Sequence, residues 1–96
     1  MEICEDIEKT LKKHNPFMSK QFRVKKIGIF GSYVRGEESE KSDVDILIEF
    51  HDTIGWEFFD VKEYLEKLLG KKVDLVTVKA LKRQLRKEIL QEVVYV

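Results

Sequence analysis

The sequence predicts an α/β (α+β) fold in which helices flank a three-stranded mixed sheet, in the order α-β-α-β-α-β-α. Short β-branched runs occur three times along the chain, and apolar residues recur at helical spacing in the segments between them. Such alternation is typical of a sheet covered by helices. A chain of 96 residues has room for one core, so we expect a single domain over residues 1–96.

The first segment is predicted to be an amphipathic helix. Ile3, Ile7 and Leu11 recur every four residues, which places them on one face of a helix over Glu2–His14. We expect this helix to end at Asn15-Pro16, because the residue before a proline is disfavoured in the α conformation.

Three short runs are predicted as strands, at Val24–Phe30, Val44–Phe50 and Val73–Val78. The first leads into a brief helix over Ser32–Gly36. The C-terminal run Val93–Val96 is predicted either to add an edge strand or to pack against apolar residues.

Two longer helices are predicted around the third strand. One is capped by Asp52-Thr53 and runs to Leu69, where Gly70 suits the left-handed closing position. Its core-facing side is Phe58, Val61, Leu65 and Leu68. The last helix is expected over Lys79–Gln91.

Composition excludes several classes of protein. Lys+Arg and Asp+Glu number 18 each, so the chain lacks the basic excess of a typical nucleic-acid binder, and we do not expect nucleic acid as a partner. No apolar run approaches the roughly 18 residues of a membrane span, and the N-terminal segment lacks a signal pattern. We therefore expect a cytoplasmic protein without a membrane partner.

Three aspartates predict a metal site. Asp43 and Asp45 are two residues apart at the start of the second strand, so their side chains project from the same face. Asp74 interrupts the apolar third strand, where a carboxylate is costly unless it is paired or bound to metal. If the second and third strands are neighbours, the three carboxylates converge and offer the hard oxygen ligands that Mg²⁺ prefers. Asp74 facing water on an edge strand is the alternative.

A phosphate-binding turn is predicted beside these acids. Gly31 allows close approach of the backbone to a ligand, and a helix that begins at Ser32 points N–H groups at an anion. Arg35, one turn later, adds positive charge for the same phosphates. Its alternative is a surface ion pair with Glu37 or Glu38. Phosphate-binding and metal-binding groups together are typical of phosphoryl-type transfer.

The pattern Gly31-Ser32, ten residues, Asp43-Val44-Asp45 resembles the signature of the DNA polymerase β-like nucleotidyltransferases. The wider run GSYVRGEESEKSDVDILIEF resembles their minimal prokaryotic members, and the likeness continues through Asp74 to the C-terminal run. The resemblance implies a nucleotidyltransferase fold and a magnesium-dependent enzyme with two metal ions. Gly31, Ser32 and Arg35 would bind the triphosphate of ATP, and Asp43, Asp45 and Asp74 would be catalytic metal ligands.

The family resemblance also implies a partner. Minimal nucleotidyltransferases often pair with a helical HEPN-type toxin and act as the antitoxin by adding AMP to it. Transfer to a small hydroxylated molecule is an alternative, although it normally needs an additional acceptor-binding domain. A non-catalytic module that masks the toxin is a third possibility. Trp56, Phe58 and Phe59 exceed what one helix face buries, and any exposed remainder would mark a partner surface.

Overall fold

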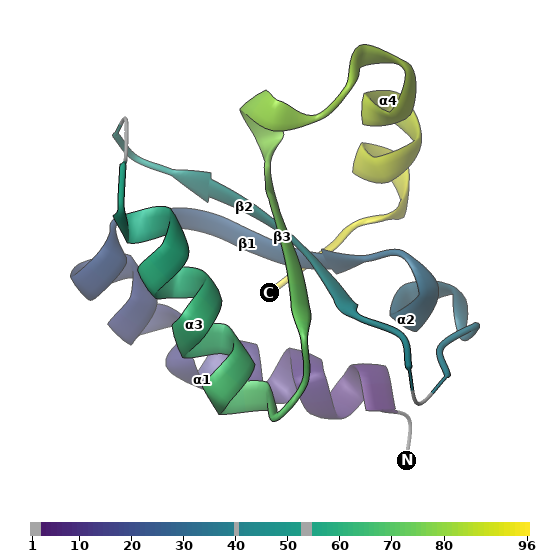
Figure 1. Cartoon of the computed structure of the whole chain (residues 1–96), viewed down its shortest axis with the longest axis horizontal. Coiled ribbons are helices and arrows are strands. Elements are labelled where there is room, and N and C mark those ends of the chain that lie inside the picture. Colours follow the sequence, from purple (N-terminus) through teal and green to yellow (C-terminus); the bar gives the residue numbers. More distant parts are fainter. Residues whose placement is uncertain (1–2, 40, 53–54) are drawn as a thin grey trace.

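The computed structural model describes residues 3–39, 41–52 and 55–96, and its centre is a mixed sheet of four strands (Figure 1). The strands are β1 (Val24–Phe30), β2 (Val44–Phe50), β3 (Val73–Thr77) and β4 (Val94–Tyr95), and they lie in the order β3-β2-β1-β4. β1 is antiparallel to β2 and β4, whereas β2 and β3 are parallel.

The predicted fold class is confirmed, but the prediction of three strands is wrong. The fourth strand is the C-terminal run, whose Val94 and Tyr95 pair with Ile29 and Gly28 of β1. The edge-strand alternative for this run is therefore the correct one. The pairing satisfies backbone groups at an edge of β1 that would otherwise be unpaired.

The helix α1 (Ile3–Phe22) continues past the predicted end and contains Pro16. A proline inside a helix costs about 3 kcal/mol, because it removes a hydrogen bond and clashes with the preceding turn. The turns after Pro16 recover this cost, since Met18 is fully buried and Phe22 packs against the core. Burial of such side chains contributes about 1.5–3 kcal/mol each. The predicted first residue, Glu2, lies outside the described residues.

Three further helices follow, α2 (Ser32–Arg35), α3 (Glu57–Leu69) and α4 (Arg83–Glu92). In α3, Val61 and Leu65 are buried as predicted, and Gly70 closes the helix at φ 65°. Thr53, part of the predicted cap, lies outside the described residues.

The last helix begins later than predicted. A 3₁₀ turn, Val78–Ala80, replaces its expected first residues, and it also shortens β3 by one residue. The Thr77 hydroxyl accepts a hydrogen bond from the Ala80 N–H at 3.2 Å, so the chain turns immediately after the strand.

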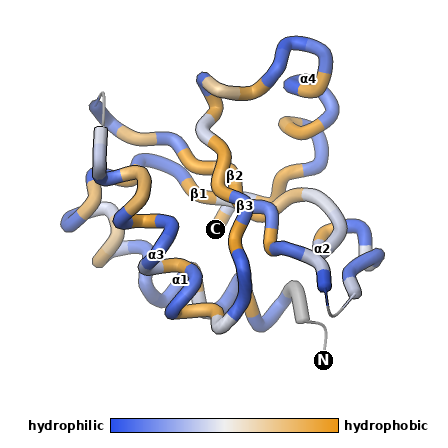
Figure 2. Tube along the Cα trace, viewed as in Figure 1, coloured by the Kyte–Doolittle hydropathy of each residue, from blue (hydrophilic) through white to orange (hydrophobic). Residues whose placement is uncertain are grey.

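The core lies between the sheet and the paired helices α1 and α3, which Figure 1 shows side by side while α4 stands apart. Hydrophobic segments are concentrated in the central strands (Figure 2). Among the described residues, every buried hydrophobic side chain falls between Ile7 and Leu75. No helix in this part of the chain has the length and apolar character needed to cross a membrane.

Candidate functional site

The three predicted aspartates come together at one end of β2 and β3. These strands are parallel neighbours, and Asp45 lies directly beside Asp74 in their register. Asp43 immediately precedes β2. Asp45 is half-buried, whereas Asp43 and Asp74 are exposed. Asp74 thus faces solvent on the edge strand, as the alternative expected, and also adjoins Asp45.

The electrostatics show that these carboxylates affect one another. Burial is the main cause that raises the pKa of Asp45 to about 6, followed by the negative charge of Asp74, a hydrogen bond with its side chain, and the charge of Asp43. Arg35 acts in the opposite direction and lowers the pKa of Asp45. Negative charge at Asp45 is thus unfavourable unless a cation compensates it.

The chemistry of this cluster fits a hard divalent cation such as Mg²⁺. Carboxylate oxygens are the ligands it prefers, and a cation between the acids would relieve the repulsion that raises the pKa of Asp45. Within the described ranges, no three Asp, Glu, His or Cys side chains are grouped closely enough to hold an ion as they stand. The Asp74 side chain already contacts that of Asp45, and Asp43 is exposed beside them.

Gly31 lies against the Asp45 carboxylate. Its φ of 79° is a left-handed value that favours glycine. A Cβ atom at this position would overlap the carboxylate and would stand 2.9 Å from Asp45 Cγ. Glycine therefore allows the turn after β1 to lie directly against the metal-ligand candidate Asp45 on β2.

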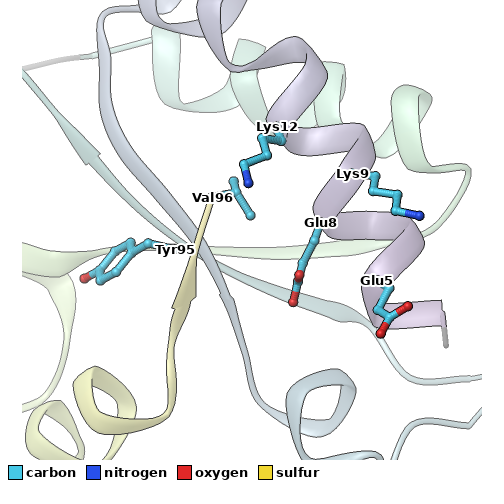
Figure 3. A pocket seen from close by; sticks show the side chains of 6 residues that line it. All are labelled: Glu5, Glu8, Lys9, Lys12, Tyr95 and Val96. Carbon is cyan, nitrogen blue, oxygen red and sulfur yellow. The ribbon is translucent and has the colours of Figure 1, made fainter.

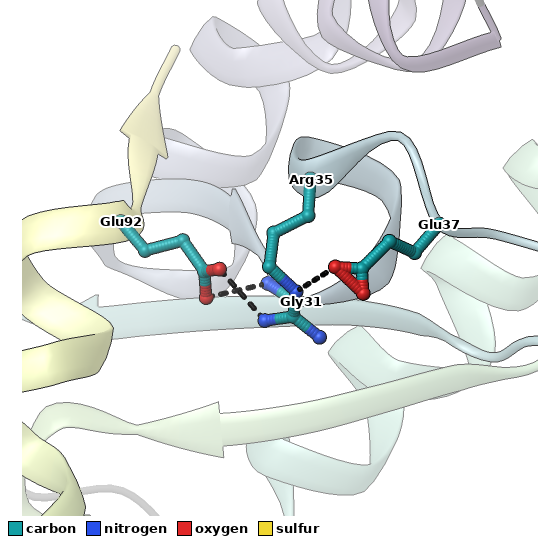
Figure 4. A network of polar contacts seen from close by, with 4 residues as sticks. All are labelled: Gly31, Arg35, Glu37 and Glu92. Atoms are coloured by element: carbon teal, nitrogen blue, oxygen red, sulfur yellow. Dashed lines mark hydrogen bonds and ion pairs between the residues drawn. The ribbon is translucent and has the colours of Figure 1, made fainter.

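Two of the predicted phosphate-binding residues, Gly31 and Arg35, contact Glu92 of α4 (Figure 4). The Gly31 N–H donates to Glu92 Oε2 at 3.0 Å, and Arg35 Nη1 donates to Glu92 Oε1 at 2.7 Å. Arg35 Nε also donates to Glu37 Oε1 at 3.1 Å, so the predicted surface pairing with Glu37 is present as well. Ser32 is partly exposed at the start of α2, next to Gly31.

Glu92 is the residue of this site that sequence reasoning missed. Along the chain it is one acid among many charged residues of a solvated helix, and it lies 61 positions from Gly31 and 57 from Arg35. Its only sequence signal is its place as the last charged residue before the C-terminal apolar run. The tertiary fold alone brings it to the phosphate-binding turn.

One hollow adjoins one of the three acids. It has a volume of about 370 Å³ and is lined by Lys41, Ser42, Asp43, Gly70, Lys71 and Lys72. A second hollow of about 330 Å³ lies elsewhere, between the first turns of α1 and the C-terminal residues Tyr95 and Val96 (Figure 3). The first contains Asp43 but none of the other predicted site residues, and the second contains none of them.

The pKa of Asp45 predicts how stability depends on pH without metal. Its folded-state value of about 6 is above the ordinary 3.8, so the folded state binds more protons between these values and loses stability as pH rises through them. Asp45→Asn should therefore raise the melting temperature in EDTA at pH 7.5. Solvent screening of this half-buried group limits the gain to about 1 kcal/mol. That corresponds to about 4–8 °C in a domain of this size.

The same comparison at pH 4.5 should show a smaller difference in melting temperature. At that pH Asp45 is protonated in the folded protein and ionised mainly in the unfolded chain, so the folded state no longer carries the unfavourable charge. Asp60→Asn removes an equal charge from the exposed part of α3 and serves as the control. An equal gain at both pH values would contradict the assigned cause.

Comparisons with known proteins agree with the fold and with the sequence signature. The profile of the nucleotidyltransferase domain matches residues 11–96. The chain is 50% identical to the protein adenylyltransferase MntA of Thermococcus cleftensis over 97 residues, which cover 100% of this chain and 98% of that protein.

Solved structures show the same architecture. One, provisionally described as a minimal nucleotidyltransferase, superposes with a TM-score of 0.82 at 29% identity and covers 98% of this chain and 95% of its own. Another contains a tri-AMPylated HEPN toxin of Shewanella oneidensis in complex with its MNT antitoxin. It has a TM-score of 0.59 at 22% identity over 96% of this chain and 66% of that one, a level of identity that shows the fold alone. The family profile, the 50% identical relative and the shared fold together show that the chain belongs to the nucleotidyltransferase domain family.

Proposed function

We propose that this nucleotidyltransferase transfers AMP from ATP to a hydroxyl group of a partner protein. The observation that carries the proposal is the place where Asp45 adjoins both Asp74 and the Gly31 backbone. Metal-ligand candidates and phosphate-binding donors meet there, as a nucleotidyl transfer requires. The 50% identical relative is named a protein adenylyltransferase, which supports AMP as the group transferred and a protein as its acceptor.

Each residue has a distinct task in this proposal. Asp43 and Asp45 would hold two Mg²⁺ ions, which would neutralise phosphate charge and lower the pKa of the acceptor hydroxyl. Asp74 completes the metal site, and its exposed carboxylate accepts the proton from the acceptor. The Gly31 N–H, Ser32 and Arg35 orient the triphosphate so that pyrophosphate leaves in line. The bond formed joins the acceptor oxygen to the α-phosphorus, and the bond broken joins that phosphorus to the pyrophosphate.

The acceptor is proposed to be a helical HEPN-type toxin, which this chain would neutralise in the cytoplasm as its antitoxin. Asp43 and Asp74 are exposed, so a hydroxyl on the surface of another folded protein can reach the site. The solved complex of a tri-AMPylated HEPN toxin of Shewanella oneidensis with its MNT antitoxin supplies the precedent.

An exposed aromatic pair offers a docking surface for that partner. Trp56 is 82% exposed and Phe59 is 60% exposed, and their ring centroids lie 6.1 Å apart at the start of α3. Phe58 packs against the core instead. Of the three aromatic residues that were expected to exceed what one helix face buries, Trp56 and Phe59 are therefore the exposed ones. Large aromatic side chains in such a position are typical of interfaces.

Asp74→Asn separates transfer from simple masking. We expect the variant to bind a co-expressed helical partner as wild type does but to add no AMP, since the amide neither accepts the proton nor ligates metal in the same way. Intact-mass measurement of the co-purified partner, with a toxicity assay, checks this. If wild type adds no mass and the variant neutralises the partner fully, the protein is a masking module. Labelled AMP on a small hydroxylated compound alone would instead support the small-molecule alternative.

A further inference from the structure

The carboxylate of Glu92 occupies the donors to which we assign the triphosphate. One oxygen accepts the Gly31 N–H at 3.0 Å, and the other accepts Arg35 Nη1 at 2.7 Å. Glu92 is the last residue of α4, and its side chain is only 21% exposed. A single carboxylate thus bridges a backbone donor after β1 and a guanidinium on α2, as a bound anion would (Figure 4).

We propose that Glu92 is an internal substitute for the substrate's phosphates and must leave before a nucleoside triphosphate binds. The inference rests on the proposed function in one respect, the placement of the triphosphate at Gly31 and Arg35. It adds a residue that controls nucleotide affinity and that belongs to neither the metal site nor the acceptor site.

The Glu92 carboxylate and a phosphate of the nucleotide cannot bind Gly31 and Arg35 at the same time, for reasons of geometry and charge. The Gly31 N–H points at one acceptor, so a phosphate oxygen at hydrogen-bond distance from it would take the place of Glu92 Oε2. Two anions side by side would also repel each other. N–H groups that donate to a carboxylate can also donate to a phosphate, because both ligands present anionic oxygens.

Glu92 can leave at low structural cost. No residue of α4 is buried, so a change at its last side chain disturbs no packed core. The pairing of β4 with β1 at Gly28 and Ile29 does not involve the Glu92 side chain. Arg35 keeps its contact with Glu37 at 3.1 Å and therefore remains positioned when Glu92 departs.

Competition of this kind lowers the apparent affinity for nucleotide. When the binding-competent form is a fraction of the population, the apparent Kd is the intrinsic Kd divided by that fraction. If Glu92 is engaged in about 70–90% of molecules, removal of its charge tightens binding by roughly three- to tenfold.

The test measures binding of the ATP analogue AMP-PNP with Mg²⁺ by isothermal titration calorimetry. Glu92→Gln keeps the shape but loses the ion pair with Arg35, and Glu92→Ala also removes the acceptor for Gly31. Both should bind roughly three- to tenfold more tightly than wild type. Glu88→Gln, an exposed acid one turn earlier on α4, removes the same charge and should change affinity less than twofold, roughly the scatter of such a measurement.

Equal or weaker binding by both Glu92 variants would overturn the inference, and weaker binding would make Glu92 a positioning residue for Arg35. A gain no larger than that of Glu88→Gln would also overturn it. Tighter binding together with no AMP transfer to any protein would overturn only the proposed function. Normal transfer with unchanged binding by the Glu92 variants would overturn only this inference. Thermal unfolding of each variant checks that the fold persists.

Discussion

Asp43→Asn and Asp45→Asn should each reduce AMP transfer by about 10²–10³-fold. The metal ions contribute several kcal/mol of transition-state stabilisation, and loss of about 3–4 kcal/mol corresponds to that change in rate. An amide presents one neutral oxygen in place of an anionic carboxylate, so both variants lose charge at the metal site. Asp45 adjoins Asp74 in the register of β2 and β3, and for this reason we expect its substitution to have the larger effect.

Single-turnover transfer of labelled AMP to the partner, measured across a range of Mg²⁺ concentrations, checks this. Asp6→Asn, at an exposed position of α1, is the control with the same chemical change and should transfer normally. Asp45→Asn should remain folded, because burial and the repulsion from Asp74 and Asp43 that it relieves outweigh the attraction of Arg35 that it loses. Wild-type transfer by either site variant would place the metals elsewhere.

Gly31→Ala should abolish metal-dependent transfer, whereas Gly36→Ala should not. Both glycines have positive φ values, 79° and 72°, but Gly36 is in the left-handed helical region with ψ 24°, whereas Gly31 has ψ −150°, in a region that is essentially restricted to glycine. Alanine therefore introduces backbone strain of about 1 kcal/mol at position 36 and about 1–3 kcal/mol at position 31. Their surroundings differ. A Cβ at Gly31 would overlap the Asp45 carboxylate, but a Cβ at Gly36 meets nothing within 4 Å.

Stability and nucleotide binding together separate a displaced ligand from an unfolded protein. The Asp45 carboxylate is the end of a side chain, so it can swing away from a Cβ at position 31, although Asp45 Cβ remains in tight contact at 3.1 Å. Gly31→Ala should therefore melt at a lower temperature than Gly36→Ala but still fold, and only Gly31→Ala should lose Mg²⁺-dependent AMP-PNP binding in calorimetry. Equal activity of both variants would show that Asp45 need not remain beside Gly31.

The local sequence was sufficient to predict the bounds of a strand where the segment carries a single pattern. β1 and β2 begin and end at the predicted residues, because short β-branched runs between polar segments have no competing helical pattern. Pro16 misled the prediction, since its local cost is offset by burial of Met18, which only the tertiary structure reveals. The fourth strand depended in the same way on a partner, the edge of β1, that the C-terminal run does not itself specify.

In the candidate site too, some features follow from the local sequence and others only from tertiary contacts. The register that sets Asp45 beside Asp74 follows from two correctly predicted strands, once they are neighbours. Gly31 was predicted to allow close approach to a ligand, and the structure adds that it accommodates the Asp45 carboxylate. Glu92 could not be predicted, because a charge at the end of a polar helix has no periodic or positional pattern that indicates what it contacts.

The distribution of buried residues also bears on how the molecule opens. Within the described chain, no residue after Leu75 is buried, although the 3₁₀ turn, α4 and β4 all lie there. Hydrogen bonds hold the end of this segment, among them Val96 N–H to the Ile27 carbonyl at 3.0 Å and Asn15 Nδ2 to the Val96 carbonyl at 3.2 Å. A segment attached by few bonds and little apolar burial is expected to exchange its amide hydrogens through its own sub-global opening, while the remainder stays folded. We therefore expect the cooperative unit that sets the global free energy of unfolding to end near Leu75. The C-terminal segment, whose β4 pairs with β1 at the edge of the sheet, is expected to form a second and weaker unit.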